Sequence, residues 1–450
     1  MGIKEKIQRH RGGLLENTVM LYILQFSNMA LGLVTQGYQM RVLGVELIGV
    51  LGAAQYATNF FQILIDFGFI YSATAKVSRF REDKNVLNKV LTCVILAKAL
   101  FMALSFLILF VFIAPSLPDM SQVLVYAFYL ISVCTYALLP DFMYRGLEQM
   151  ATITVRAVAI KFFATMMIFL FVRQPGDYYM VPLFTAIGNV GAIVFVYWHL
   201  FHKVGVRFCK VTWYEVWVEL KESSQFFLSK VAGSINSNLN GILLGTMAGP
   251  TATGLYTNAD KIIGAARSGM SPIADSLYPH MMKHKNFSLI KKAMLIVYPV
   301  ILLGCAVVFL FAEPLLVFWL GAEGSQVVLP LRLLIPVAVF CFPNYVLGYP
   351  TMGAMGLAKF ANISVVFGTF VYLAGVAVLW LTVGINLVSL CLLTSVTEGS
   401  ILAFRLVVRP YRETKTIYEP PPDGRRPRNH REAEVKKFSS PGGENPLPFP

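Results

Sequence analysis

The chain has 450 residues and a formal net charge of +14, with 56% hydrophobic and only 14% charged residues. Soluble proteins have about a quarter of their residues charged, so a soluble fold of this composition would expose large apolar patches and aggregate. Disorder is excluded as well, because 34 Phe and 20 Tyr are the opposite of a disordered composition. The composition predicts a membrane protein with several spans. Its basic residues lie mostly between apolar segments, which indicates a role in membrane topology rather than nucleic-acid binding.

The predicted elements begin with a basic N-terminus, residues 1–13, followed by an apolar segment from about Leu14 to Met40. This segment is long enough to cross a hydrocarbon core of about 30 Å as a helix, and it is too long for a signal-peptide core. Similar segments follow near residues 44–72, 86–113, 121–144, 151–172, 178–201, 222–247, 253–280, 290–312, 326–350, 358–382 and 386–408. Their apolar runs are continuous and do not alternate as barrel strands would. The expected fold class is all-α, a polytopic membrane protein with about twelve transmembrane helices.

Basic residues are concentrated in alternate loops. Lys and Arg are frequent in residues 76–89, 203–221 and 283–292, whereas the intervening loops hold mainly acidic residues such as Asp119 and Glu313. Cytoplasmic loops carry an excess of Lys and Arg. The pattern therefore predicts that both termini are cytoplasmic.

The longest internal polar segment, about residues 202–221, divides the spans into two sets of six. We expect an N-terminal lobe at 14–201, a cytoplasmic linker at 202–221 and a C-terminal lobe at 222–408. The last segment, 409–450, contains Pro420–Pro422 and few aliphatic residues. Such a composition predicts a disordered cytoplasmic tail, whose role stays open.

A weak internal repeat relates the two sets of spans. At a constant offset of 205 positions, Gly44 and Gly49 align with Gly249 and Gly254 without a gap. Six spans return the chain to its starting side of the membrane, as a parallel repeat of the kind found in transporters requires. We expect two pseudo-symmetric lobes around a central cavity.

Ionisable residues at membrane depth are costly and normally face a protein interior or a hydrated cavity. The candidates are Asp66, Lys98, Lys161, Lys230, Asp260, Lys261, Arg267, Asp275, Arg332 and Glu398, with Arg41 at the outer end of the first span. Their number favours a large hydrated cavity between the lobes. Snorkelling toward the interface is the alternative for Lys98 and Lys161, and interfacial anchoring is the alternative for Arg41.

The span near 253–280 has the highest density of these residues. Asp260 and Arg267 are seven positions apart and share a helix face, while Lys261 lies about 100° away from Asp260. A cavity wide enough to meet Lys261 and Arg267 could bind an anionic head group such as a phosphate. The alternative is that Asp260 and Lys261 pair with other helices and only stabilise the bundle. Asp275 is open to both interpretations.

Motifs of soluble enzymes are missing from the sequence. It contains no GxxxxGK[ST] phosphate loop, no HExxH, no GxSxG and no CxxC pair. We therefore expect no catalytic residues, no metal site and no cofactor. Transport would draw on a substrate gradient, on membrane potential or on a coupling ion, H⁺ or Na⁺, which the sequence does not distinguish.

Several motifs resemble a known family. The segments Glu16–Tyr22, Gln39–Gly44 and Asp66–Gly68, together with Gly254–Tyr256 and Ala259–Lys261, are similar to signatures of the Wzx-type oligosaccharide-lipid flippases. These proteins belong to the multidrug/oligosaccharidyl-lipid/polysaccharide exporter superfamily. The resemblance covers about residues 14–408. The sequence departs from the family at Gly37-Tyr38, where Pro-Tyr is usual, and in its longer tail.

The resemblance implies a flippase that moves a polyprenyl-diphosphate-linked oligosaccharide across the bacterial inner membrane by alternating access. The transported oligosaccharide would be used to assemble a surface polysaccharide, such as O-antigen. The partners would include a polysaccharide polymerase and other assembly proteins. Lys261 and Arg267 would hold the diphosphate. The identity of the sugar and the oligomeric state are not predicted.

Two alternatives remain at this point. A drug/cation antiporter of the same superfamily would need a cavity dominated by carboxylates, whereas cations are at least as frequent as acids at membrane depth here. A membrane enzyme that uses lipid-linked sugars would need a large extramembrane loop with catalytic acids, and the longest internal loop has about 20 residues.

Overall fold

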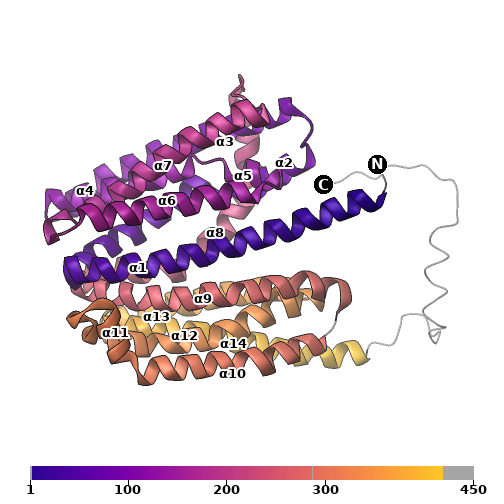
Figure 1. Ribbon diagram of the computed structural model, residues 1–450. Coiled ribbons are helices and arrows are strands. Elements are labelled where there is room, and N and C mark those ends of the chain that lie inside the picture. Colours follow the sequence, from indigo (N-terminus) through magenta and orange to yellow (C-terminus); the bar gives the residue numbers. More distant parts are fainter. Residues whose placement is uncertain (1–2, 286, 419–450) are drawn as a thin grey trace. The chain divides into compact units, whose positions relative to one another are not determined.

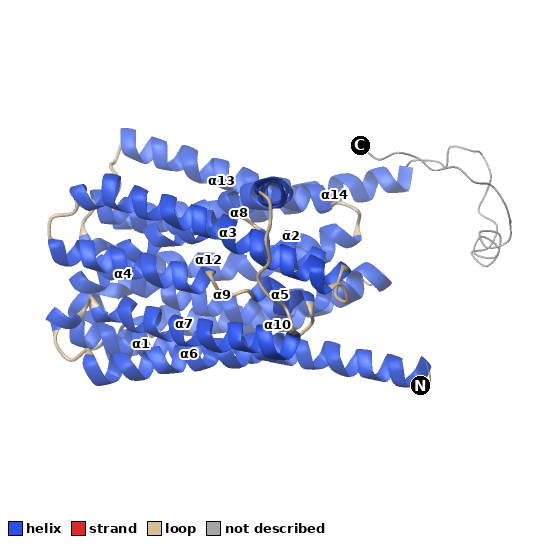
Figure 2. Cartoon of the chain, turned by 90° about the horizontal axis from the view of Figure 1, so that it is seen from above, coloured by secondary structure: helices blue, strands red, loops and turns tan. Residues whose placement is uncertain are grey.

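The computed structural model of the chain describes residues 3–285 and 287–418. These residues form helices joined by short connections and contain no strand (Figure 2), which confirms the predicted all-α class. The helices are α1 (Ile3–Asp66), α2 (Phe69–Arg79), α3 (Lys84–Ile108), α4 (Met120–Ala137), α5 (Asp141–Gly146), α6 (Met150–Phe171), α7 (Met180–His199), α8 (Trp213–Met247), α9 (Pro250–His284), α10 (Phe287–Leu310), α11 (Ala312–Leu320), α12 (Val328–Val346), α13 (Ala358–Leu381) and α14 (Leu387–Tyr418).

Two predicted connections differ from the observed elements. Helix α8 begins at Trp213 with a capping box between Thr212 and Glu215, so it starts inside the predicted linker 202–221. Helix α14 continues to Tyr418, into the predicted tail 409–450. The chain divides into a large compact unit that ends at Arg405 and a second unit that follows it. The rest of the predicted tail, residues 419–450, lies outside the described residues.

Nine segments of the described chain are long and apolar enough to cross a membrane, judged by length and composition. The first of them, Tyr22–Arg79, contains two spans that meet at Gly44, which makes ten. Helices α8 and α9 are long enough but too polar to meet the same criterion, so the expected count of twelve stays a prediction. Their polar residues, such as Asn240 and Asp260, are turned toward other helices rather than toward lipid.

The internal repeat is present in the backbone. Gly44 has φ 77° and ψ 170°, and Gly249 has φ 89° and ψ 173°, a conformation that glycine adopts without a steric penalty. At both positions the chain turns into the following span. A Cβ on Gly49 would lie 1.7 Å from the carbonyl oxygen of Pro250, and one on Gly254 would lie 1.9 Å from that of Val45. The two repeats therefore cross each other at equivalent glycines.

The hydrophobic core forms separate clusters. One cluster joins residues of α2, α3, α5, α6 and α7 with Val216 and Leu220 near the start of α8. Another joins α9 to α14 with the middle of α1, with Leu244 near the end of α8 and with residues of α4, α6 and α7 such as Ile168. Helix α1 runs beside α9 and packs against α6 and α8 as well (Figure 1). Helices α1 and α8 therefore connect the halves, and the polar residues on them lie between the halves.

Candidate functional site

A cavity with a volume of about 470 Å³ lies among α1, α4, α6, α7 and α9. Its charged lining residues are Lys161 of α6 and Lys261 of α9, and its described lining contains no carboxylate. Carboxamides make up much of the remaining polar wall, and they are Asn28, Gln36, Gln39, Gln55, Asn59, Gln62 and Asn189. Hydroxyl groups complete it, contributed by Thr35, Thr58, Tyr129, Ser132, Tyr136, Thr165, Thr185 and Thr257.

The two lysines of the cavity have no carboxylate beside them among its described lining residues. Neither Lys161 nor Lys261 has an ion pair or a side-chain hydrogen bond to another described residue, and Lys261 is repelled by Lys161 and attracted by Asp260. An unpaired cation in a partly buried site is unfavourable unless an anion accompanies it. The arrangement is therefore suited to an anionic ligand with several acceptor oxygens, such as a phosphate or diphosphate.

One end of the cavity is closed by contacts between α1 and α9. The Gln36 amide donates to Oδ1 of Asn258 at 2.8 Å, and a Cβ on Gly52 would lie 2.4 Å from Oγ1 of Thr257. The crossing of Gly49 and Gly254 lies beyond these contacts. Outside the crossing, Glu323 accepts a hydrogen bond from the backbone N–H of Val45 at 2.7 Å. This end of the molecule is tightly packed, so a ligand would reach the cavity from elsewhere.

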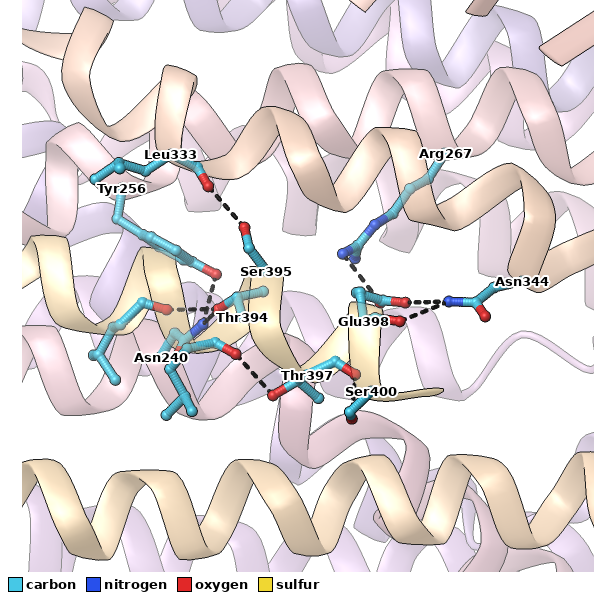
Figure 3. Close-up of polar contacts among 12 residues, drawn as sticks. Asn240, Tyr256, Arg267, Leu333, Asn344, Thr394, Ser395, Thr397, Glu398 and Ser400 are labelled. Atoms are coloured by element: carbon cyan, nitrogen blue, oxygen red, sulfur yellow. Dashed lines mark hydrogen bonds and ion pairs between the residues drawn. The ribbon is translucent and has the colours of Figure 1, made fainter. Parts of the chain in front are cut away.

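Arg267 lies in a different place from Lys261. It lines a second, smaller cavity of about 30 Å³ together with Asp260 and Glu398. Nη2 of Arg267 lies 3.4 Å from Oε1 of Glu398, and Glu398 accepts a hydrogen bond from Asn344 at 3.1 Å, as Figure 3 shows. Asp260 accepts from the Tyr56 hydroxyl at 3.0 Å. These charges are compensated within the protein.

The structure therefore does not form the joint phosphate site that we expected from Lys261 and Arg267. The reason is helical geometry, because side chains six positions apart point in directions about 120° apart around a helix axis. Lys261 shares its cavity with Lys161 instead. The combination of these two lysines on α6 and α9 is the main feature that the sequence did not reveal.

The smaller cavity continues into a network of neutral hydrogen bonds. Asn240 donates to the hydroxyl of Tyr256 at 3.0 Å and to Thr394 at 2.7 Å, as Figure 3 shows. It accepts a hydrogen bond from Tyr372 at 2.6 Å. These contacts join α8, α9, α13 and α14. Together with the ion pair of Arg267, they indicate that this region stabilises the C-terminal half.

Three other candidate residues form a second charged group at the end of α1. Nζ of Lys98 lies 3.2 Å from Oδ1 of Asp66 and donates to the carbonyl oxygen of Ala137 at 2.7 Å. Nζ of Lys230 lies 4.0 Å from Oδ2 of Asp66. None of the three lines either cavity.

The last two candidates have local contacts. Arg41 is exposed and donates to the carbonyl oxygen of Phe318, which agrees with an anchoring role. Asp275 is exposed and accepts a hydrogen bond from Ser271 at 3.1 Å. Neither residue lines either of the two cavities described above.

Sequence reasoning missed most of the cavity wall. The carboxamides of α1 that line the cavity, such as Asn28, Asn59 and Gln62, were not among the predicted site residues. Gln55, Asn59 and Gln62 follow each other at four and three positions, a spacing that places side chains on one helix face. That spacing is a signal in the sequence that could have identified the polar wall.

Several known proteins are similar to this chain in sequence, and others are similar in fold. The model of the family described as polysaccharide biosynthesis protein matches residues 14–285. A provisionally named O-antigen transporter of Shigella dysenteriae is 24% identical over 319 residues, which cover 69% of this chain and 78% of that protein. One with the same name from Escherichia coli K12 is 23% identical over 282 residues, covering 62% and 68%.

Two solved structures have a similar fold. An inward-facing multidrug resistance MATE family transporter of the MOP superfamily superposes with a TM-score of 0.70 at 15% identity, covering 89% of this chain and all of that chain. The lipid II flippase MurJ, in an inward closed conformation, superposes with a TM-score of 0.66 at 13% identity, covering 87% of each chain. On the family match and this shared fold, the chain belongs to the polysaccharide biosynthesis protein family.

Proposed function

We propose that this protein is a flippase that moves a polyprenyl-diphosphate-linked oligosaccharide across the bacterial inner membrane for surface polysaccharide assembly. The observation that carries the proposal is the cavity with two unpaired lysines and no carboxylate among its described lining residues. The names of the O-antigen transporters and of the lipid II flippase support the same class of substrate.

The chemistry of the cavity fits each part of such a substrate. Lys161 and Lys261 would bind the diphosphate through charge-assisted hydrogen bonds. The carboxamides of α1 carry both donors and acceptors, as hydroxyl-rich sugars require. The polyprenyl chain would stay in the bilayer, so the protein need only shield the head group, whose transfer through hydrocarbon is otherwise very costly.

The distribution of basic loops supports a cytoplasmic position for both termini. On that orientation, the packed end with Gly49 and Gly254 is the outer end, and the cavity receives its substrate from the cytoplasmic side. Alternating access would then require α1 and α9 to separate at these glycines. A polysaccharide polymerase and other assembly proteins would be partners on the outer side.

An antiporter for cationic drugs is the second candidate, because MATE transporters share the fold. The absence of acidic side chains from the described cavity lining argues against it, since a cationic ligand would meet two lysines there. The solved structures with a similar fold give no support to an enzymatic function, because they are transporters and a flippase.

The proposal is tested with purified protein in liposomes and a fluorescent polyprenyl-diphosphate-linked disaccharide. Lys161→Gln and Lys261→Gln should each weaken binding by about 10- to 100-fold, since each removes a charge-assisted hydrogen bond of about 1.5–3 kcal/mol. Arg332→Gln is the matched control, because Arg332 donates to the carbonyl oxygen of Phe309 and lines neither cavity. Unchanged binding in both lysine variants would contradict the proposal.

The energy source can be examined in the same liposomes. We propose that no bound cofactor is needed and that an H⁺ or Na⁺ gradient, or the membrane potential, drives transport. Each of these three driving forces is imposed separately, and we expect only one of them to accelerate transport. Equal rates under all conditions would indicate that the substrate gradient suffices.

A further inference from the structure

The charged group of Asp66, Lys98 and Lys230 contains one carboxylate and two cations. Lys98 is held firmly, because its ammonium group has the Asp66 carboxylate at 3.2 Å and the carbonyl oxygen of Ala137 at 2.7 Å. Its side chain is only 5% exposed. The charge of Asp66 is therefore already balanced by Lys98, which leaves Lys230 as a surplus cation.

Lys230 is held more loosely than Lys98. Its Nζ lies 4.0 Å from Oδ2 of Asp66, beyond good hydrogen-bonding distance, and its side chain is 28% exposed. Its other contact is with the ring of Tyr71, whose centroid lies 6.0 Å from Nζ. Among the described residues, Asp66 is the sole ion-pair partner of Lys230. Such a cation can exchange its partner for a better acceptor at little cost.

A band of polar side chains connects this group with the large cavity. On α1, Gln62 and Asn59 precede Asp66 by four and seven positions, and both line the cavity. They therefore share a helix face with Asp66. On α8, Ser234 and Asn238 follow Lys230 at four and eight positions.

The two helices meet within this band. The Asn59 amide donates to Oδ1 of Asn238 at 2.9 Å, so the polar face of α8 is in contact with the cavity wall. The band leads from Lys230 of α8, which lies near Asp66 at the end of α1, to the cavity that contains Lys161 and Lys261. It lies toward the basic loop 76–89, the end that the loop charges assign to the cytoplasm.

We propose that Lys230 is a loading site for the phosphate groups of the substrate, occupied before they reach Lys161 and Lys261. This inference rests on the proposed function. A diphosphate offers several strong acceptor oxygens, whereas Asp66 is shared with Lys98. The incoming phosphate therefore displaces Asp66 from Lys230 while Asp66 stays neutralised by Lys98. The carboxamides of the band then supply hydrogen bonds along the way to the cavity.

The loading site predicts a kinetic effect that differs from that of the cavity lysines. A cation at the mouth of a site attracts an anionic substrate and raises its rate of capture, by about tenfold or more at low ionic strength. Lys230→Gln should therefore raise the half-saturating substrate concentration about tenfold and reduce its dependence on NaCl. The maximal rate should stay within about twofold of the wild type, because the cavity is intact. Lys230→Arg should restore the wild-type values.

Transport of the fluorescent polyprenyl-diphosphate-linked disaccharide is measured over a range of substrate densities and NaCl concentrations, with Arg332→Gln as the charge-matched control. The melting temperature of each variant is measured in parallel. A wild-type half-saturating concentration in Lys230→Gln overturns the loading site. So does a fall in maximal rate and melting temperature without a change in that concentration, which would make Lys230 a structural link between α8 and α1.

The two proposals fail in different ways. Loss of binding in Lys161→Gln and Lys261→Gln, with wild-type kinetics in Lys230→Gln, leaves the proposed function intact and removes only the loading site. Normal binding in the two cavity variants contradicts the proposed function, whatever the result for Lys230.

Discussion

Helix α9 carries two cations that differ in what surrounds them. Lys261 faces the large cavity, where the other charged group among the described lining residues is Lys161, a second cation. Arg267, less than two turns further along, faces the smaller cavity and lies 3.4 Å from the Glu398 carboxylate. Both lie within a helix that the sequence placed across the membrane. Depth alone therefore does not show whether a cation is paired within the protein.

Lys261 and Arg267 differ in ion pairing, because only Arg267 has an ion-pair partner among the described residues. A buried ion pair contributes little net stability, but removing one partner is costly because the other charge is left uncompensated. An unpaired cation shows the opposite behaviour, since its removal relieves repulsion within the protein and weakens only the binding of an anion. Substitutions in the two regions should therefore affect different measurements.

The largest effect is expected from Lys261→Glu. The change removes a charge-assisted hydrogen bond and adds repulsion, which together weaken diphosphate binding by about 3 kcal/mol or more, roughly a hundredfold. The melting temperature should not fall, because the new carboxylate can pair with Lys161. Binding and melting temperature are measured on the same preparation, and Lys261→Arg serves as the control that keeps the charge. Normal binding by Lys261→Glu would show that Lys261 does not bind the diphosphate.

An intermediate effect on stability is expected in the smaller cavity. Arg267→Gln and Glu398→Gln should each lower the free energy of unfolding by about 1–2 kcal/mol, because each leaves a largely buried charge without its partner. The double variant should recover part of this loss, as coupled residues do in a double-mutant cycle. Substrate affinity should stay within about twofold of the wild type. A loss of affinity at an unchanged melting temperature would instead assign Arg267 to the substrate, as the sequence first suggested.

The smallest effect is expected from an exposed pair at the start of α8. The hydrogen bond from Lys89 and the one from the backbone N–H of Thr212 lower the pKa of Glu215 from its usual 4.5 to about 2. Since this pKa is lowered by folding, the stabilisation is fully present above about pH 4.5 and disappears as the pH falls toward 2. The difference in melting temperature between the wild type and Glu215→Gln should follow this course. A difference that does not vary with pH would show that the carboxylate charge is unimportant there.

Much of the fold follows from local features of the chain. Long apolar segments predict the helices, because backbone groups in a bilayer must be satisfied within the segment. The alignment of Gly44 and Gly249 predicts the repeat, because both positions adopt a backbone conformation that favours glycine. The polar α8 and α9 are less apparent from hydropathy, since their Asn, Asp and Lys side chains are covered by neighbouring helices.

The candidate site was predicted only in part. The list of ionisable residues at membrane depth included both Lys161 and Lys261, but the anion site was expected at Lys261 and Arg267. Lys261 and Arg267 line different cavities in the structure, because the two side chains project about 120° apart around α9. The spacing of Gln55, Asn59 and Gln62 on α1 contained information that was not used.

Composition and loop charge, which are properties of the chain alone, were sufficient to identify a helical membrane protein with an excess of deep cations. They could not assign a partner to each cation, because Glu398 is 131 residues away from Arg267 along the chain and Lys161 is 100 residues away from Lys261. Packing of α6, α9 and α14 decides which charges meet and which remain unpaired. The distinction between a binding cation and a structural one arises at that level, since the free energy of a buried charge depends on its nearest neighbours.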